Sequence, residues 1–205
     1  MKLKKSVKRI IIIAVILIIA GSSFIAYESL NKKETKKATV VNEIKEYGYT
    51  LKSNKSEKYK EMFQELKNIL SKDEVDEKAY VEQISKMFIL DFYSLDDKLA
   101  NTDVGGVDFL HQDAKTNFLE KSEDTIYKYV ENNIYGNRNQ DLPEVDNITI
   151  DNIDTVEYTI GTDNTDQEAY QVEIEWTYKK DMDYQNKATL TFVHEGKKLS
   201  LVEVK

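Results

Sequence analysis

The first hydrophobic segment of the chain is an uncharged run of eighteen residues, 10–27. At a helical rise of 1.5 Å per residue the run would extend about 27 Å, close to the thickness of the hydrocarbon core of a bilayer. It therefore predicts a transmembrane helix. The residues expected to anchor this helix are Ile10, Ile13, Ile16, Ile19 and Phe24, with Tyr27 at the headgroup boundary.

A basic segment before this run predicts its orientation. Residues 1–9 contain Lys2, Lys4, Lys5, Lys8 and Arg9. The positive-inside rule places this tail in the cytoplasm and the rest of the chain outside, in a protein of the cell membrane with a single span. The alternative is a secretory signal peptide cleaved near Ala20-Gly21-Ser22, which would release the protein. The length of the run favours the uncleaved anchor.

The next segment, residues 28–46, is rich in Lys, Glu, Thr and Asn and predicts a solvated stalk. Residues 44–51 place Tyr47, Tyr49 and Leu51 around Gly48, which predicts an extended arm or a short strand. Residues 47–205 are long enough to bury the core of one extracytoplasmic domain.

Helical spacing dominates the first half of this domain. Apolar residues recur at three and four residue steps over 56–70 and again over 77–95, where Asp76 can cap the helix. The second stripe is broad, so we expect that helix to be buried on more than one side. A third helix is predicted to begin near Val107, and Ser122 is predicted to cap a fourth helix that carries Ile126 and Val130.

From residue 145 onwards the hydrophobic period changes to two. The predicted strands cover residues 145–153, 156–161, 169–180, 187–195 and 198–204. The third strand alternates most clearly, with Tyr170, Val172 and Trp176 on one face and Glu173 and Glu175 on the other. The sequence thus predicts an α+β fold in which a helical layer packs on one face of a curved antiparallel sheet.

Charge and cysteine content exclude several classes of function. The chain has a net charge of −8, and because residues 1–9 contribute five positive charges, the remainder carries −13. Nucleic acids bind proteins through Lys and Arg contacts to phosphates, so a nucleic-acid partner is not expected. The chain contains no cysteine, which excludes disulfides, thiol nucleophiles and lipid attachment to a cysteine.

The order of these elements, together with particular segments, carries a family resemblance. The segments are YGYTLKSN, YKEMFQELKNIL, KMFILDFYSL and NTDVGG, within residues 47–205. This region resembles the nuclear transport factor 2-like (cystatin-like cone) superfamily, and in particular membrane-anchored proteins of Gram-positive bacteria. The resemblance implies a cone-like domain and a range of roles that includes isomerases, dehydratases and envelope scaffolds. The His-Asp pair typical of the enzymes has no obvious match here.

Few residues qualify as a functional site. Asp91 interrupts an apolar helix, and we weigh a pocket carboxylate with a raised pKa, acting as general base, against a structural carboxylate satisfied by hydrogen bonds. Gly105, Gly106 and Val107 form either a turn or an interaction point. The two histidines, His111 and His194, are interpreted as surface residues.

Residues 163–168 are rich in oxygen ligands but lack the glycine and the final Glu of a calcium loop, so they predict a solvated hairpin. No cofactor or metal site is expected from the sequence.

Two hypotheses for function follow. The first is a non-catalytic, membrane-anchored module that docks onto another envelope protein or onto a second copy, and it predicts an exposed apolar patch on the open sheet or around Val107. The second is a small-molecule binding or catalytic cone with Asp91 in its pocket, and it predicts a deep cavity.

Overall fold

A computed structural model describes residues 38–205, of which 38–133 and 138–205 pack as one compact unit. The predicted basic tail, the predicted transmembrane helix and most of the predicted stalk lie outside the described residues. Within residues 38–205, none of the helices is both long and apolar enough to cross a membrane.

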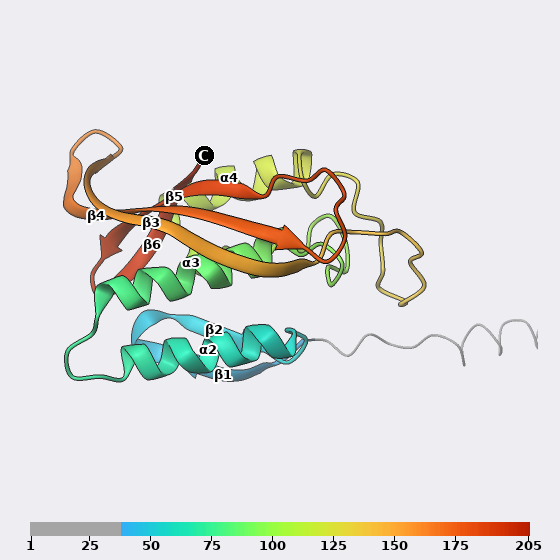
Figure 1. Cartoon of the computed structure of the whole chain (residues 1–205), viewed down its shortest axis with the longest axis horizontal. Coiled ribbons are helices and arrows are strands. Elements are labelled where there is room, and N and C mark those ends of the chain that lie inside the picture. Colours follow the sequence, from blue (N-terminus) through green and yellow to red (C-terminus); the bar gives the residue numbers. More distant parts are fainter. Residues whose placement is uncertain (1–37) are drawn as a thin grey trace, which may run out of the picture. The chain divides into compact units, whose positions relative to one another are not determined.

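The unit has an α+β fold, as predicted, built on an antiparallel sheet (Figure 1). Its four strands are neighbours in chain order: β3 (Val145–Ile160), β4 (Asn164–Tyr178), β5 (Lys187–Glu195) and β6 (Lys198–Val204). Such a meander needs only hairpin connections, which the polar linkers of the sequence provide. β3 and β6 are therefore the two edge strands.

Three helices precede the sheet in the chain, and the first two begin within one residue of the predicted positions. α2 (Glu57–Leu70) is capped by Ser56, which accepts a hydrogen bond from the Tyr59 amide at 3.2 Å. α3 (Glu77–Tyr93) is capped by Asp76, which accepts one from the Ala79 amide at 3.1 Å. α3 packs between α2 and the sheet, and this position explains why its apolar stripe is so broad.

The predicted stalk is too long at its C-terminal end. Residues Val40–Ile44 form strand β1, which pairs antiparallel with β2 (Tyr49–Lys52) through the short 3-10 helix η1 (Lys45–Tyr47). The folded unit therefore begins before residue 47. The prediction of a short strand is correct for β2, where Tyr49 and Leu51 are buried.

The third helical region also differs from the prediction. A 3-10 turn, η2 (Val107–Phe109), is followed by α4 (Gln112–Asp124). Ser122 lies inside α4, and its hydroxyl donates to the Phe118 carbonyl at 2.7 Å, so it caps no new helix. The chain beyond α4 turns instead, and it buries Tyr127 completely.

The sheet has one strand fewer than predicted, because residues 145–160 form a single strand. β3 pairs with β4 along its whole length, with register irregularities near residues 146, 151 and 157. Bulges of this kind bend and twist a long strand without ending it. β4 also begins earlier than predicted, at Asn164, inside the oxygen-rich segment 163–168.

Aromatic side chains fill the space between the helices and the sheet. Trp176 of β4 lies 4.3 Å from Tyr93 of α3, measured between ring centroids. Phe92 contacts Phe118 at 4.9 Å and Tyr127 at 5.4 Å by the same measure. Each aromatic side chain buries a large apolar area, so this layer accounts for much of the driving force for folding without a disulfide.

Candidate functional site

Asp91, the predicted candidate residue, lies in the last turn of α3 and is 7% exposed. One carboxylate oxygen, Oδ1, binds the ammonium group of Lys55 and lies 3.6 Å from that of Lys98. The other oxygen, Oδ2, accepts a hydrogen bond from the Gly106 amide at 2.8 Å. Asp91 therefore joins α3 to the segment before α2 and to two loops.

Charge partners determine the ionisation of this group. Burial alone would raise the pKa of Asp91, but Lys98 and then Lys55 outweigh it and lower the pKa. Burial likewise opposes the charge on Lys98, and Asp91 and Asp97 reverse this by raising its pKa. Asp91 is thus a stable carboxylate with satisfied oxygens, which fits the structural interpretation and not the general base with a raised pKa.

The glycines after Val104 form a turn that packs tightly against α3. A Cβ atom on Gly105 would lie 1.9 Å from the Asp91 carbonyl oxygen. Gly106 has a φ of +74°, and a Cβ atom there would lie 2.6 Å from Cδ2 of Phe88. Both glycines are buried, whereas Val107 is half-buried in η2. The turn is therefore a packing element, and its glycines offer no exposed interaction surface.

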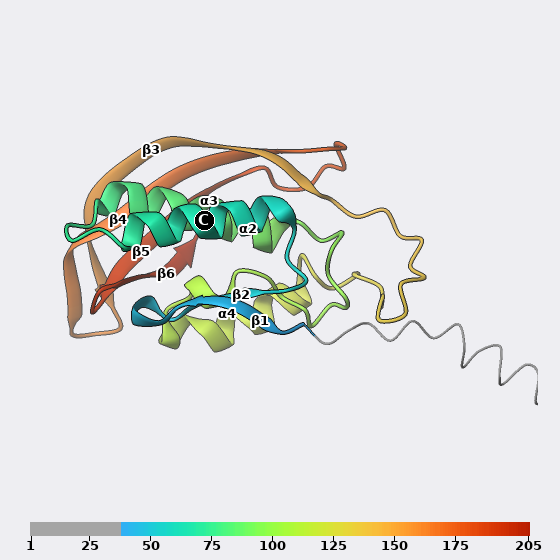
Figure 2. The same ribbon diagram turned by 90° about the horizontal axis from the view of Figure 1, so that it is seen from below.

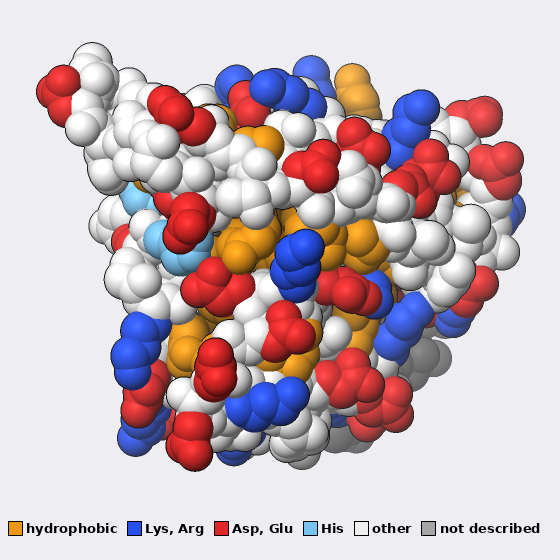
Figure 3. Space-filling view, turned by 60° about the vertical axis from the view of Figure 1, so that its left-hand side comes forward, with side chains coloured by type: hydrophobic (Ala, Val, Ile, Leu, Met, Phe, Trp, Pro, Cys, Tyr) orange, Lys and Arg blue, Asp and Glu red, His pale blue; other side chains and the backbone are white. Residues whose placement is uncertain are grey.

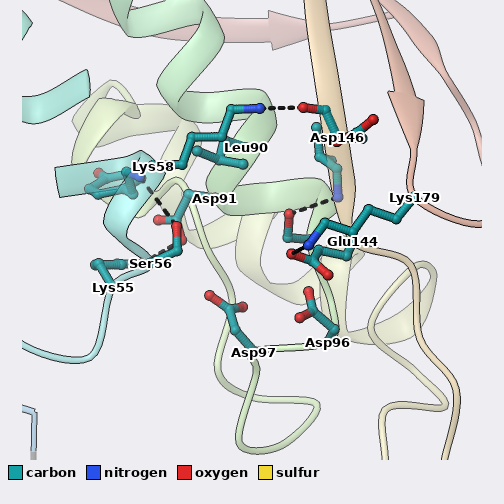
Figure 4. A pocket seen from close by; sticks show the side chains of 13 residues that line it. Lys55, Ser56, Lys58, Leu90, Asp91, Asp96, Asp97, Glu144, Asp146 and Lys179 are labelled. Carbon is teal, nitrogen blue, oxygen red and sulfur yellow. Dashed lines mark hydrogen bonds and ion pairs between the residues drawn. The ribbon is translucent and has the colours of Figure 1, made fainter. Parts of the chain in front are cut away.

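A small pocket of about 260 Å³ opens beside Asp91 (Figure 4). Several of its lining residues bind one another. Lys179 pairs with the Glu144 carboxylate at 2.7 Å, and Lys58 donates to the backbone carbonyl of Asp146. Partial burial, and then the negative charges of Asp97 and Glu144, raise the pKa of the Asp96 carboxyl group to about 6. Ligand pockets commonly exceed about 300 Å³, so this pocket is smaller than a usual small-molecule site. A second pocket that Asp91 lines, together with Lys52 and Lys115, has about 400 Å³ and reaches that range.

His194 belongs to a network that the sequence did not predict. Its Nδ1 atom lies 2.9 Å from Oδ2 of Asp166, and its Nε2 atom lies 3.5 Å from Oε2 of Glu77. Tyr170 donates to the same Glu77 oxygen at 2.9 Å. The four residues come from β5, β4 and the N-terminus of α3, so the network ties the sheet to that helix end.

The carboxylates also control the charge of this histidine. Burial would lower the pKa of His194, but its bonds to Asp166 and then to Glu77 raise it. His111, in contrast, caps α4 by accepting from the Asp113 amide at 3.3 Å. The two histidines therefore belong to separate networks, and no group of three or more His, Asp and Glu residues in 38–205 could hold a metal ion.

The strongest surface feature is the charge of β3 and β4, which sequence reasoning missed. The two strands contain no Lys, Arg or His. Their acidic residues are Asp146, Asp151, Asp154, Glu157, Asp166, Glu168, Glu173 and Glu175. A count of charges by segment would have found this acidic ribbon.

The open face of the sheet, one of the two predicted locations, does not carry the apolar patch. The open face of the sheet presents Glu173, Glu175 and Lys187, all exposed. On the face shown in Figure 3, apolar side chains appear between charged groups. The exposed large apolar residues include Val40 and Val41 of β1 and Tyr129. Ile148, Ile150 and Ile153 of β3 are among the partly buried residues that pack against the core.

Comparisons of the chain with protein-family models, with curated proteins and with solved structures found no match.

Proposed function

We propose that this protein is a single-pass membrane protein whose exported α+β domain docks onto another protein of the bacterial cell envelope, without catalysis. The unpaired edge of β3 carries the proposal. In the described part of the chain, the backbone of residues 147–160 forms hydrogen bonds with β4 alone, so its outer edge is open to a partner. Native proteins usually cover, shorten or charge such edges.

The interior argues for docking over small-molecule binding. Trp176, Phe88, Phe109 and Phe192 are each at most 2% exposed, so they occupy the space that a cone-shaped pocket would need. Asp91 is held as a carboxylate by two lysines and an amide, and this arrangement leaves it no free proton-accepting role. These observations support a surface function.

The membrane anchor and the nuclear transport factor 2-like ancestry belong to the same proposal. The run of residues 10–27, with its basic flank, supports the anchor. The packing of helices on one face of an antiparallel sheet supports a relationship to that superfamily at the level of fold class.

Photo-crosslinking in living cells tests the docking function. A photoreactive amino acid would replace Asn152 on β3, Thr177 on β4, Val107 beside the turn, or Glu74 in the α2–α3 loop as the control. We expect one recurrent envelope protein to be captured from Asn152 and not from Glu74, because only the first position lies on the open edge. Equal capture of many proteins from all four positions would contradict docking.

A further inference from the structure

The open edge of β3 has a defined length. Pairing with β4 is regular over residues 147–150 and again over 152–156, and the irregularities on either side interrupt it. In an antiparallel pair, only part of each strand's amides and carbonyls point to the neighbour, and the rest point away. An added strand would find regular hydrogen-bonding groups over these two stretches, which limits it to a short segment.

The two faces of this edge differ in chemistry. Ile148, Ile150 and Ile153 lie on the face that packs against α3, and each is partly buried. Asp151 and Asp154 are exposed. Asp154 pairs with Gln171 of β4, and the exposed Glu173 and Glu175 follow at alternate positions of that strand. The face of the sheet opposite to the isoleucines is therefore acidic at this edge.

The basic residues on the open face of the sheet come from β5 and from the residue after β6, and none comes from β3 or β4. The lysines on the open face of the sheet are Lys187 at the start of β5 and Lys205 after β6, and Lys187 pairs with Glu175 in the register of β4 and β5. β3 lies at the opposite margin from β6 (Figure 2). Its acidic residues have no basic partner on the adjacent strand, because β4 contains none. Across the open face, Asp151 shares a hollow with Lys187 and Lys205.

A second copy of the chain fits this edge poorly. Two β3 edges would bring Asp151 and Asp154 of one copy close to the same residues of the other, and like charges on paired strands are unfavourable. A basic segment has the opposite effect, because its Lys or Arg residues would lie beside carboxylates that have no basic partner on β4. The same charges thus oppose self-pairing and favour one class of partner.

We propose that the β3 edge between Asn147 and Val156 binds an extended segment of a partner protein in which apolar residues alternate with Lys or Arg. The inference rests on the proposed docking function and specifies its partner. The apolar side chains of the added strand continue the isoleucine row over α3, and its basic side chains lie beside Asp151 and Asp154. Backbone hydrogen bonds provide affinity, and the alternation provides specificity.

The test uses the full chain in nanodiscs of zwitterionic lipid and short synthetic peptides as probes. In one peptide Lys and Val alternate, in a second Glu and Val alternate, and a third has the composition of the first in a non-alternating order. We expect the Lys-Val peptide to bind roughly ten-fold more tightly than the Glu-Val peptide, because opposite charges across paired strands are favourable and like charges are not. Reordering the residues should weaken binding.

Variants of the protein distinguish binding at the β3 edge from electrostatic attraction to the acidic protein as a whole. Asp151→Lys combined with Asp154→Lys should reverse the preference, so that the Glu-Val peptide binds more tightly. Asp73→Lys combined with Glu74→Lys makes the same charge change on exposed residues of the α2–α3 loop and should leave the preference intact. Hydrogen exchange should slow at amides within 147–156 when the Lys-Val peptide binds.

Equal binding of the Lys-Val and Glu-Val peptides, or an unchanged preference in the β3 variant, would overturn the inference. Binding without amide protection in β3 would overturn it as well, since charge attraction alone forms no backbone bonds. Capture of a partner in cells from Val107 or Glu74 but not from Asn152 would refute the β3 edge and leave docking supported. Peptide binding at β3 without any recurrent captured protein would refute docking alone.

Discussion

Asp91 and Lys98 form an ion pair in the interior, with Oδ1 and Nζ 3.6 Å apart and with side chains that are 8% and 3% exposed. Lys55 and Asp97 extend the pair at its two ends. Removing one charge from such a pair leaves the other buried without compensation, which costs more than the intact pair contributes. The group is therefore a point where the fold is sensitive to single substitutions.

We expect Asp91→Asn to lower the free energy of unfolding by roughly 3 kcal/mol, the lower part of the range for breaking a buried pair. Asn can still accept the hydrogen bond from the Gly106 amide, so the lost stability reports the effect of the charge. Urea denaturation followed by circular dichroism measures it. Asp73→Asn, on the exposed α2–α3 loop, serves as the control and should change stability little. Equal stability of the two variants would contradict the role given to the pair.

The turn at Gly105 gives a second prediction. Gly105→Ala should destabilise the protein by roughly 3 kcal/mol or more, because a side chain there overlaps the backbone of α3. Gly48→Ala is the matched variant: Gly48 has a φ of +69°, but nothing lies within 4 Å of the added carbon. It should cost only about 1 kcal/mol of backbone strain. Thermal unfolding measures both losses, and equal melting temperatures of the two variants would contradict the close approach of Gly105 to α3.

His194 predicts a dependence of stability on pH. Because folding raises the pKa of this histidine, its contribution to stability is complete below the unfolded pKa of about 6.5 and is lost as the pH rises through the folded value. Above pH 6.5, the free energy of unfolding should therefore decrease more for the native protein than for His194→Gln. His111→Gln is the control, because its ring belongs to a separate network. Parallel stability curves for native protein and His194→Gln would refute the prediction.

The absence of cysteine makes the membrane topology testable by single labels. We expect Ser6→Cys to resist a membrane-impermeant maleimide in intact cells and Lys72→Cys to react, because the predicted span separates the two positions. Both should react after lysis. Protection of Lys72→Cys in intact cells would contradict an exported domain, and loss of residue 6 from the mature protein would identify a cleaved signal.

Local sequence predicted α2, α3, β5 and β6 closely, but not α4 or the full length of β3. Ser56 and Asp76 precede helical stripes and do cap α2 and α3, because a cap depends on residues within one turn. Ser122 has the same residue type but sits inside α4, where its hydroxyl binds a carbonyl four residues earlier. The two predicted strands 145–153 and 156–161 left out Asp154 and Thr155, yet both residues pair with β4 and belong to β3.

The candidate site was predictable only in part. Asp91 was conspicuous as a charge in an apolar stripe, but its partner Lys55 comes from a different element, and no local pattern joins the two. The network of His194, Asp166 and Glu77 likewise assembles residues from three separate elements. Long-range contacts of this kind follow from the packing of the sheet on α3, which the sequence specifies only through the whole fold.

In the proposed membrane protein, the early start of β1 limits the distance between the domain and the bilayer. With the anchor ending at Tyr27 as proposed and the folded unit beginning at Val40, twelve residues connect them. Fully extended, such a connection reaches about 40 Å, whereas the nineteen residues of the predicted stalk would have reached about 65 Å. A protein bound at β3 would therefore lie within this reach plus the length of the domain itself, which favours partners that are themselves membrane proteins.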